Sequence, residues 1–351
     1  MMKLVNILRR GVNVGASDIH LTVGVRPIIR VNGSLNRVGN EQLTPEDLED
    51  FLEELLPADS QKEVELREEG QTDLGYQWNE YRFRINAYYQ RGNPAIAFRI
   101  IPNKIPSLNE LGVPRKVKDV ATKPRGLFLV TGPTGSGKST TLAAMIDLIN
   151  RQDDQHIITL EDPIEYTHQH EKSIVNQRAV GEDTDSFAAG LRSALRQDPD
   201  IIMVGEMRDL ETISTAITAA GTGHLVLATL HTNGSSETID RIIDVFPPHQ
   251  QNQIRSQLSL TLIGVLSQQL LPTIDGRSKV LATELMMANS AVKNLIREGK
   301  VHQIESVMQT GKDSGMHTMD YALRDLYRQG KITREQALTR ALNRETLESL
   351  I

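Results

Sequence analysis

Hydrophobic and polar residues alternate in the first part of the chain. From Tyr81 to Ala87, the odd-numbered positions are mostly apolar or aromatic and the even-numbered ones are polar, which predicts a β-strand with one buried face. Three further strands are expected at residues 17–23, 27–34 and 95–101. Apolar residues at helical spacing follow Pro45, so we expect a helix there with Thr44 as its cap. Residues 1–105 therefore predict a mixed α/β domain.

Short apolar runs mark the second part of the chain. They predict strands at residues 126–131, 155–160, 201–204 and 225–230. Helical patterns lie between the runs, which is typical of an α/β fold. Beyond His231 the chain is expected to be mostly helical.

A proline-rich stretch separates the two parts. Prolines stand at positions 102, 106, 114 and 124, with Gly112 and several lysines between them, and this composition is typical of a linker. We therefore expect a linker at residues 106–123, a second domain with its core at 124–285, and a helical C-terminal region at 286–351.

Composition limits the classes of function. A chain of 351 residues is long enough for about two domains. The absence of cysteine excludes cysteine-ligated zinc, disulfide bonds and thiol catalysis. A net charge of −6 and an aromatic content of 4% disfavour a nucleic-acid motor, so no nucleic-acid partner is expected. No run predicts a transmembrane segment or a signal peptide, and we expect a cytoplasmic protein.

The strongest motif follows the predicted strand at 126–131. It reads Gly132-Pro133-Thr134-Gly135-Ser136-Gly137-Lys138-Ser139 and matches the phosphate-binding pattern G-x-x-x-x-G-K-[ST] at every fixed position. The glycines allow a tight turn that points backbone N–H groups at phosphates, Lys138 supplies a positive charge, and Ser139 offers a hydroxyl to Mg²⁺. A helical pattern begins with Thr140, so the loop lies at a helix N-terminus, which favours anions. We expect residues 132–140 to bind a nucleoside triphosphate.

Carboxylates follow the next two predicted strands. After residues 155–160 come Glu161, Asp162 and Glu165, and after residues 201–204 comes Glu206. A carboxylate at the end of a strand beside a phosphate loop can order Mg²⁺ or orient the attacking water. The alternative interpretation is an ordinary acidic turn.

Two histidines bracket the predicted strand at 225–230. His224 precedes it and His231 follows it, and both are candidates for sensing phosphate, against the alternative of a structural role.

Three arginines lie on the predicted strands of the first domain. Arg82 and Arg84 share the polar face of the strand that begins at Tyr81, and Arg99 lies on the strand at 95–101. Such arginines are usually solvated or paired with acids. Because phosphoryl transfer needs positive charge at the transition state, Arg84 and Arg99 are also candidate catalytic residues, and Arg82 is a weaker one.

Four sequence boxes in fixed order resemble those of the type II secretion and type IV pilus ATPases. They are Gly132 to Ser139, Glu161 to Glu165, Asp198 to Asp209 and Gly223 to Asn233, which are similar to the Walker A, Asp, Walker B and His boxes of that family. Within it, the chain is similar to the pilus retraction group. The assembly and secretion members usually carry a tetracysteine zinc element, and Ala291 to Glu298 resembles a helix motif of the retraction group, although Val292 and Lys293 depart from it.

The resemblance implies an architecture and a set of partners. It implies a PAS-like N-terminal domain, a RecA-like ATPase domain, ATP and Mg²⁺ as cofactors, and a homohexamer peripheral to the inner membrane at the pilus base. Its implied partner is the inner-membrane pilus platform protein, with a paralogous retraction ATPase as a further candidate. The implied activity is ATP hydrolysis that drives pilus retraction and twitching motility.

The resemblance also implies roles for individual residues. Lys138 would hold the outer phosphates, and Ser139 with Glu206 would form the Mg²⁺ shell. Glu165 would activate water, with Glu161 as second choice, and His231 would contact the γ-phosphate. The implied role of Arg84 and Arg99 is to bring positive charge to the phosphates, and that of His224 is to tie the sheet to a neighbouring element.

Three alternatives remain open at the level of sequence. The first is a pilus assembly or type II secretion ATPase, which the absence of cysteine disfavours. The second is a nucleic-acid translocase on the same core, which the acidic charge disfavours. The third is an accessory subunit of the pilus motor with weak hydrolysis, which the intact Lys138, Glu165 and Glu206 disfavour.

Overall fold

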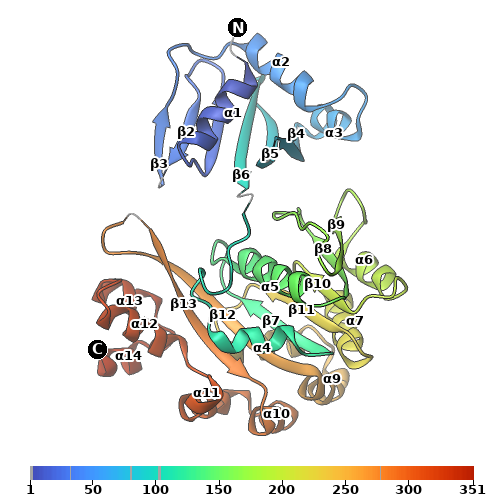
Figure 1. Cartoon of the computed structure of the whole chain (residues 1–351), viewed down its shortest axis with the longest axis vertical. Coiled ribbons are helices and arrows are strands. Elements are labelled where there is room, and N and C mark those ends of the chain that lie inside the picture. Colours follow the sequence, from blue (N-terminus) through green and yellow to red (C-terminus); the bar gives the residue numbers. More distant parts are fainter. Residues whose placement is uncertain (1–2, 32, 80, 102–103, 277) are drawn as a thin grey trace. The chain divides into compact units, whose positions relative to one another are not determined.

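The computed structural model describes residues 3–31, 33–79, 81–101, 104–276 and 278–351. The chain divides into two compact units, Met1–Lys104 and Ile105–Ile351, which we call unit 1 and unit 2 (Figure 1). Each unit combines a β-sheet with helices and has its own hydrophobic core. The predicted α/β class, with an N-terminal domain followed by a P-loop domain, is confirmed.

Unit 1 is built on an antiparallel sheet with strand order β3-β2-β1-β6-β5-β4. Its strands are β1 (Asp18–Thr22), β2 (Ile28–Val31), β3 (Ser34–Arg37), β4 (Gln71–Trp78), β5 (Tyr81–Gln90) and β6 (Asn93–Ile101). The alternating pattern on β5 buries Phe83 and Ile85 completely, as the sequence predicts. β4 is an edge strand that is not among the predicted ones, although Leu74, Tyr76 and Trp78 alternate along it and pack against the core.

Three helices contribute to the core of unit 1. They are α1 (Leu4–Asn13), α2 (Pro45–Leu55) and α3 (Gln61–Glu69). Leu4 and Leu8 of α1 and Leu48 of α2 join the buried apolar face of the sheet. The predicted cap is confirmed, because the Thr44 side chain accepts a hydrogen bond from the Asp47 amide while the Asp47 carboxylate accepts one from the Thr44 amide.

Unit 2 contains a seven-stranded sheet with the order β13-β12-β7-β11-β10-β8-β9. All neighbouring strands are parallel except the edge strand β13, which is antiparallel to β12. The strands are β7 (Gly126–Thr131), β8 (His156–Glu161), β9 (Ile174–Ala179), β10 (Ile201–Val204), β11 (Leu225–Leu230), β12 (Leu262–Pro272) and β13 (Lys279–Met287). The four predicted apolar strands are confirmed as β7, β8, β10 and β11.

Helices cover the sheet of unit 2 on both faces. One core combines β7 with α4 (Lys118–Ala121) and α5 (Lys138–Gln152). The other core packs a series of helices against the opposite face. These are α6 (Phe187–Ala194), α7 (Leu210–Gly221), α8 (Ser235–Asp244), α9 (Pro248–Thr261), α10 (Ser290–Arg297) and α11 (Ile304–Thr310). Parallel strands have their C-terminal ends on the same side of the sheet. The loops after β7, β8, β10 and β11 therefore lie on that side.

The segment predicted as a linker at 106–123 is instead folded into unit 2. It contains a short 3₁₀ helix (Arg115–Val117) followed by α4. Leu108, Val117 and Val120 are buried in the core that also holds α5. The prolines and lysines suggested a linker, but apolar residues at wide spacing between them are enough to pack the segment onto the sheet.

The region after His231 is less helical than predicted. β12 and β13 form a long antiparallel hairpin there, with Leu266 paired to Leu285. The polar residues Ser267 and Gln268 interrupt the apolar run of β12, yet both are completely buried in the sheet. A strand buried on both faces lacks the alternating pattern of a half-buried one, so the sequence pattern does not predict the hairpin.

Three C-terminal helices pack at the far end of this hairpin (Figure 1). They are α12 (Met319–Arg328), α13 (Arg334–Arg340) and α14 (Arg344–Leu350). Met319 and Leu323 are buried against Leu271 of β12 and Ala282 of β13.

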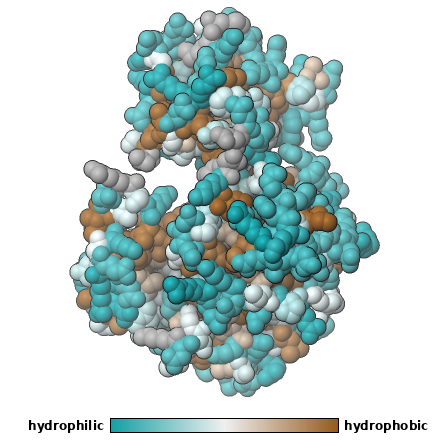
Figure 2. Space-filling view, in the orientation of Figure 1, coloured by the Kyte–Doolittle hydropathy of each residue, from teal (hydrophilic) through white to brown (hydrophobic). Residues whose placement is uncertain are grey.

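The visible surface is mostly hydrophilic, with apolar residues scattered among polar ones (Figure 2). The most exposed large apolar side chain of the described residues, Leu260 on α9, is 74% accessible. None of the described helices is long and apolar enough to cross a membrane.

Candidate functional site

The phosphate-binding loop connects the buried strand β7 to the N-terminus of α5. Gly132, Gly135 and Gly137 have φ angles of 139°, 78° and 90°, a region that favours glycine. At Gly132 a Cβ atom would lie 2.3 Å from the Gln268 carbonyl oxygen, so the loop also has no room for a side chain there. Sequence and sheet packing together impose this conformation, which presents the first amides of α5 to an anion.

The Lys138 side chain is held inside the loop. Its Nζ atom donates hydrogen bonds to the carbonyl oxygens of Gly132 at 2.8 Å and Pro133 at 3.1 Å, and it lies 3.5 Å from Nδ1 of His231. Burial lowers the pKa of Lys138, while the carboxylates of Glu206 and Glu165 act in the opposite direction. The ammonium group therefore lies within electrostatic reach of both predicted catalytic carboxylates.

His231 connects Lys138 to Glu206. Its Nε2 atom lies 3.3 Å from Oε1 of Glu206, which also accepts a contact of 2.5 Å from Nε of Arg208. Burial alone would raise the pKa of Glu206, but Arg208 and His231 outweigh it, so the pKa lies below its usual value. Glu206 is therefore an ionised carboxylate at neutral pH.

The donor set fits a magnesium ion held mainly by a bound nucleotide. Ser139 is exposed at the first turn of α5, and Glu206 supplies an ionised oxygen ligand. In the part of the chain that the structure describes, no group of three or more acidic, histidine or cysteine side chains could hold a metal alone. Mg²⁺ commonly binds through one or two protein oxygens together with phosphates and water, so the chemistry of Ser139 and Glu206 fits this ion.

Glu161 and Glu165, at the end of β8 and in the loop that follows it, are both partly buried. The Glu161 carboxyl accepts hydrogen bonds from Thr159 Oγ1 at 2.6 Å, from Gln177 Nε2 at 2.9 Å and from the Glu165 amide. Burial raises its pKa, and these hydrogen bonds act against the rise. The bond from the Glu165 amide lets the Glu161 carboxyl fix the loop that carries Glu165, and its second-choice assignment to water activation stays a prediction.

Asp162 lies between these two glutamates and is exposed. Its charge acts on Arg208, whose pKa is raised mainly by the hydrogen bond to Glu206. The loops after β8 and β10 are thus electrostatically linked, and Asp162 has an indirect connection to Glu206.

The candidate arginines of unit 1 lie on neighbouring strands. Arg84 on β5 pairs in register with Arg99 on β6, which pairs in turn with Asp18 on β1. Nε of Arg99 donates to Oδ1 of Asp18 at 3.1 Å, and Nε of Arg84 lies 3.9 Å from Oδ1 of Asp73. Both side chains are accessible to solvent, at 67% for Arg99 and 40% for Arg84. Each is thus held by an acid and still available to a ligand.

A family model described as type II/IV secretion system protein matches residues 2–349. The chain belongs to the type II/IV secretion system protein family. With the intact phosphate loop described above, this membership makes the chain an ATPase. The resemblance to the type II secretion and type IV pilus ATPases that the sequence boxes predict is thus confirmed.

Members of this family with named functions are similar over most of their length. A twitching motility protein of Neisseria gonorrhoeae is 50% identical over 322 residues, covering 92% of this chain and 86% of that protein. The type IV pilus retraction ATPase PilT of Pseudomonas aeruginosa is 47% identical over 341 residues, covering 97% and 98%. A crystal structure of the pilus retraction motor PilT with bound ADP is 50% identical, with a TM-score of 0.92 over 99% of this chain and 100% of that one.

Of the two candidate histidines, this ATPase brings only His231 to the phosphate loop. His224 precedes β11, at the N-terminal end of the parallel strands. There its carbonyl oxygen accepts a hydrogen bond from the amide of Gly126 at the start of β7. Its Nδ1 atom contacts the carbonyl oxygen of Ala219 at 3.0 Å. His224 as a phosphate sensor is therefore wrong, because the length of β11 separates it from the phosphate loop.

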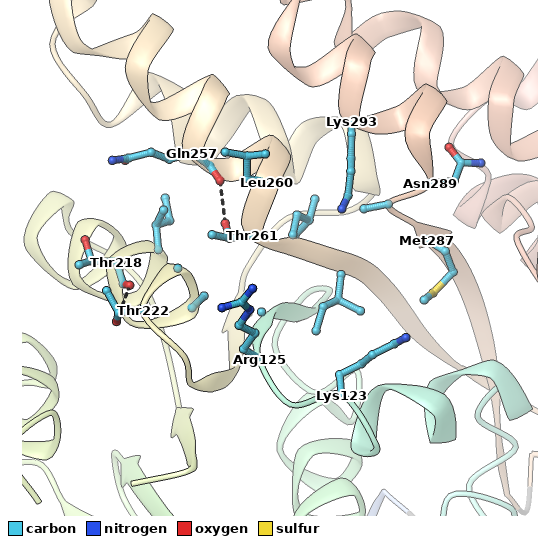
Figure 3. A pocket seen from close by; sticks show the side chains of 17 residues that line it. Lys123, Arg125, Thr218, Thr222, Gln257, Leu260, Thr261, Met287, Asn289 and Lys293 are labelled. Carbon is cyan, nitrogen blue, oxygen red and sulfur yellow. Dashed lines mark hydrogen bonds between the residues drawn. The ribbon is translucent and has the colours of Figure 1, made fainter. Parts of the chain in front are cut away.

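A large hollow of unit 2 also lies at the N-terminal end of the parallel strands. It has a volume of about 830 Å³ and is lined by the starts of β7 and β12 and the ends of α7 and α9. Arg125 and Lys293 point into it from opposite sides (Figure 3), and Lys123 also lines it. The hollow is thus separate from the phosphate loop and is not the nucleotide site.

Sequence reasoning missed three residues that support the nucleotide site. Arg208 pairs with Glu206, Gln177 holds the loop after β8, and Gln268 of β12 donates to Thr141 Oγ1 of α5 at 2.8 Å. Arg208 lies inside the third sequence box and could have been found there by its charge. Gln177 and Gln268 carry no such signal, because their partners, Glu161 and Thr141, lie 16 and 127 positions away in the sequence.

Proposed function

We propose that this chain is the hexameric, ATP-driven motor of type IV pilus retraction, and so of twitching motility. The observation that carries the proposal is identity of 47–50% to a twitching motility protein and to PilT over more than nine-tenths of the chain. The connected side chains of Lys138, His231 and Glu206 support it, because an accessory subunit without hydrolysis would not need them.

The proposed mechanism assigns each residue a task. Lys138 and the loop amides hold the β- and γ-phosphates, and His231 contacts the γ-phosphate. A Mg²⁺ ion held by Ser139 and Glu206 would neutralise charge on the phosphates. Glu165 orients the attacking water, which matters more in phosphoryl transfer than proton abstraction does.

Arg84 and Arg99 complete the proposal from unit 1. Both are solvent-accessible cations, paired in register on the neighbouring strands β5 and β6. An arginine at the transferred phosphate can raise the rate of hydrolysis by about 10³ to 10⁵. We propose that they approach the nucleotide during turnover, so that hydrolysis is tied to movement of unit 1.

The partners belong to the same proposal. The motor would act in the cytoplasm at the pilus base, on the inner-membrane platform protein, with a paralogous retraction ATPase as a further partner. The full-length similarity to retraction proteins supports this assignment.

Two measurements test the proposal. Purified protein is assayed for ATP hydrolysis and for its assembly state by light scattering, beside Lys138→Ala and Glu206→Gln. The gene is also expressed in a piliated strain that lacks its own retraction ATPase. A hydrolysing ring that restores twitching, with both variants inactive, supports the proposal, whereas hydrolysis without restored twitching contradicts the retraction function.

A further inference from the structure

Glu284 on β13 is a buried carboxylate outside the nucleotide site. Its side chain makes two hydrogen bonds to backbone amides, from Ser235 to Oε1 at 2.7 Å and from Met319 to Oε2 at 3.2 Å. The residue is 5% exposed. Burial raises its pKa, and both amides act against that rise. A buried carboxyl group is costly unless its hydrogen bonds are made, so these two contacts account for its position.

The two amides begin two different helices. Ser235 is the first residue of α8 and Met319 the first of α12. The residue before α8 is Gly234, which has no side chain to cap the helix. Glu284 on β13 instead accepts a hydrogen bond from the amide of Ser235, the first residue of α8, at a helix end that favours negative charge.

The start of α8 is continuous with His231. We call residues 231–235 the His231 loop. From α8, Thr238 Oγ1 donates to the carbonyl oxygen of Gly234 in this loop at 2.6 Å and contacts Thr232 Oγ1 at 2.7 Å. The Asn233 amide donates to Glu237 Oε2 at 2.9 Å. The loop is therefore tied to the first turn of α8, which Glu284 holds.

On its other side, Glu284 reaches the C-terminal helices. Next to Met319 on α12, the buried carboxyl of Asp320 accepts hydrogen bonds from the amides of Leu342 at 2.9 Å and Asn343 at 3.0 Å. Asn343 caps α14. A continuous set of contacts thus runs from the His231 loop through Glu284 to α12 and α14.

We propose that Glu284 is a positioning residue that joins the His231 loop to α12, so that the position of His231 and the packing of the C-terminal helices change together. This inference rests on the proposed function, because it uses His231 as a residue of the ATP site. The energetic coupling between these two parts is measured directly.

The first test is a double-mutant cycle in steady-state ATP hydrolysis. Glu284→Gln keeps the shape of the side chain but replaces one acceptor by a donor. We expect kcat to fall about tenfold with KM changed less than about threefold, since positioning acts on the reacting state. In a His231→Ala background the same change should lower kcat less than about twofold. An equal fall in both backgrounds would overturn the proposal.

The neighbouring buried carboxylate tests the far end of the path. Asp320→Asn disturbs the contact between α12 and the start of α14 and leaves the bonds of Glu284 in place. It should lower thermal stability, and its effect on kcat should be smaller in a His231→Ala background than in the wild type. If Asp320→Asn combines additively with His231→Ala, the packing of the C-terminal helices does not change with His231, which contradicts the proposal. Should Glu284→Gln fail to fold, Glu284→Asp replaces it in the cycle, because it keeps the charge and shortens the reach.

A second test does not depend on hydrolysis. Hydrogen exchange is compared with and without a non-hydrolysable ATP analogue. The proposal expects protection to change in residues 232–236 and 317–321 together in the wild type, and in 232–236 alone in Glu284→Gln. A wild-type change confined to 232–236 contradicts the coupling, even where the protein turns over ATP normally. Absent turnover with coupled protection would instead contradict only the proposed function.

Discussion

His231 Nε2 lies 3.3 Å from Glu206 Oε1, and this contact joins the ends of β11 and β10. The other ring nitrogen lies 3.5 Å from Nζ of Lys138. One imidazole thus stands between the cation and the carboxylate of the nucleotide site, so a change at either neighbour also alters the histidine.

Glu206→Gln tests the metal role of this carboxylate. The change keeps the shape but removes the charge that would hold Mg²⁺, so we expect turnover to fall about 100-fold or more. In the wild type, EDTA should weaken ATP binding measured by calorimetry. In Glu206→Gln, EDTA should weaken it much less, and an undiminished effect of EDTA would remove Glu206 from the metal site.

Glu165→Gln separates hydrolysis from binding. Because Glu165 is proposed to orient water and not to hold nucleotide, turnover should fall about 10²-fold to 10⁴-fold while ATP affinity changes less than about threefold. Glu171→Gln, an exposed carboxylate of the same loop, is the control and should behave as wild type. Equal losses of affinity and turnover would contradict the role of Glu165.

Arg99→Ala tests the contribution of unit 1. We expect turnover to fall at least about tenfold with ATP binding nearly unchanged. The matched control is Arg30→Ala, since Arg30 also faces Asp18, at 3.9 Å, on the neighbouring strand β2. If both variants lose the same small amount of activity, Arg99 serves only the ion pair with Asp18.

The stability of unit 2 should fall in mild acid because of His168. Burial lowers the pKa of His168 from 6.5 to about 4, and the charge of Asp147 acts weakly against this. Between these two values the unfolded chain binds a proton that the folded protein does not. The free energy of unfolding should therefore fall as the pH drops from 6.5 to about 4, by about 3 kcal/mol at most. Urea unfolding of wild type and His168→Gln at pH 7 and pH 5 checks this, with the exposed His249→Gln as control.

The sequence predicts those parts of the site whose residues are close together along the chain. The phosphate loop and the carboxylates after β8 and β10 follow directly from short motifs, since a strand, a turn and a helix are local. The contacts of Glu284 join residues 49 and 35 positions apart, and Gln268 reaches Thr141 from 127 positions away. Such contacts depend on strand order, which local patterns do not encode, and the unpredicted hairpin of β12 and β13 carries them.

The order of strands in unit 2 also gives the two loops of the nucleotide site different local stability. β7 lies inside the sheet between β12 and β11, whereas Gln177, which supports the Glu165 loop, lies on the edge strand β9 with a single neighbour. An edge strand opens at a lower free-energy cost than an interior one. On gentle heating, the water-activating loop should therefore loosen before the phosphate loop does, leaving a protein that still binds nucleotide but has stopped working as a motor.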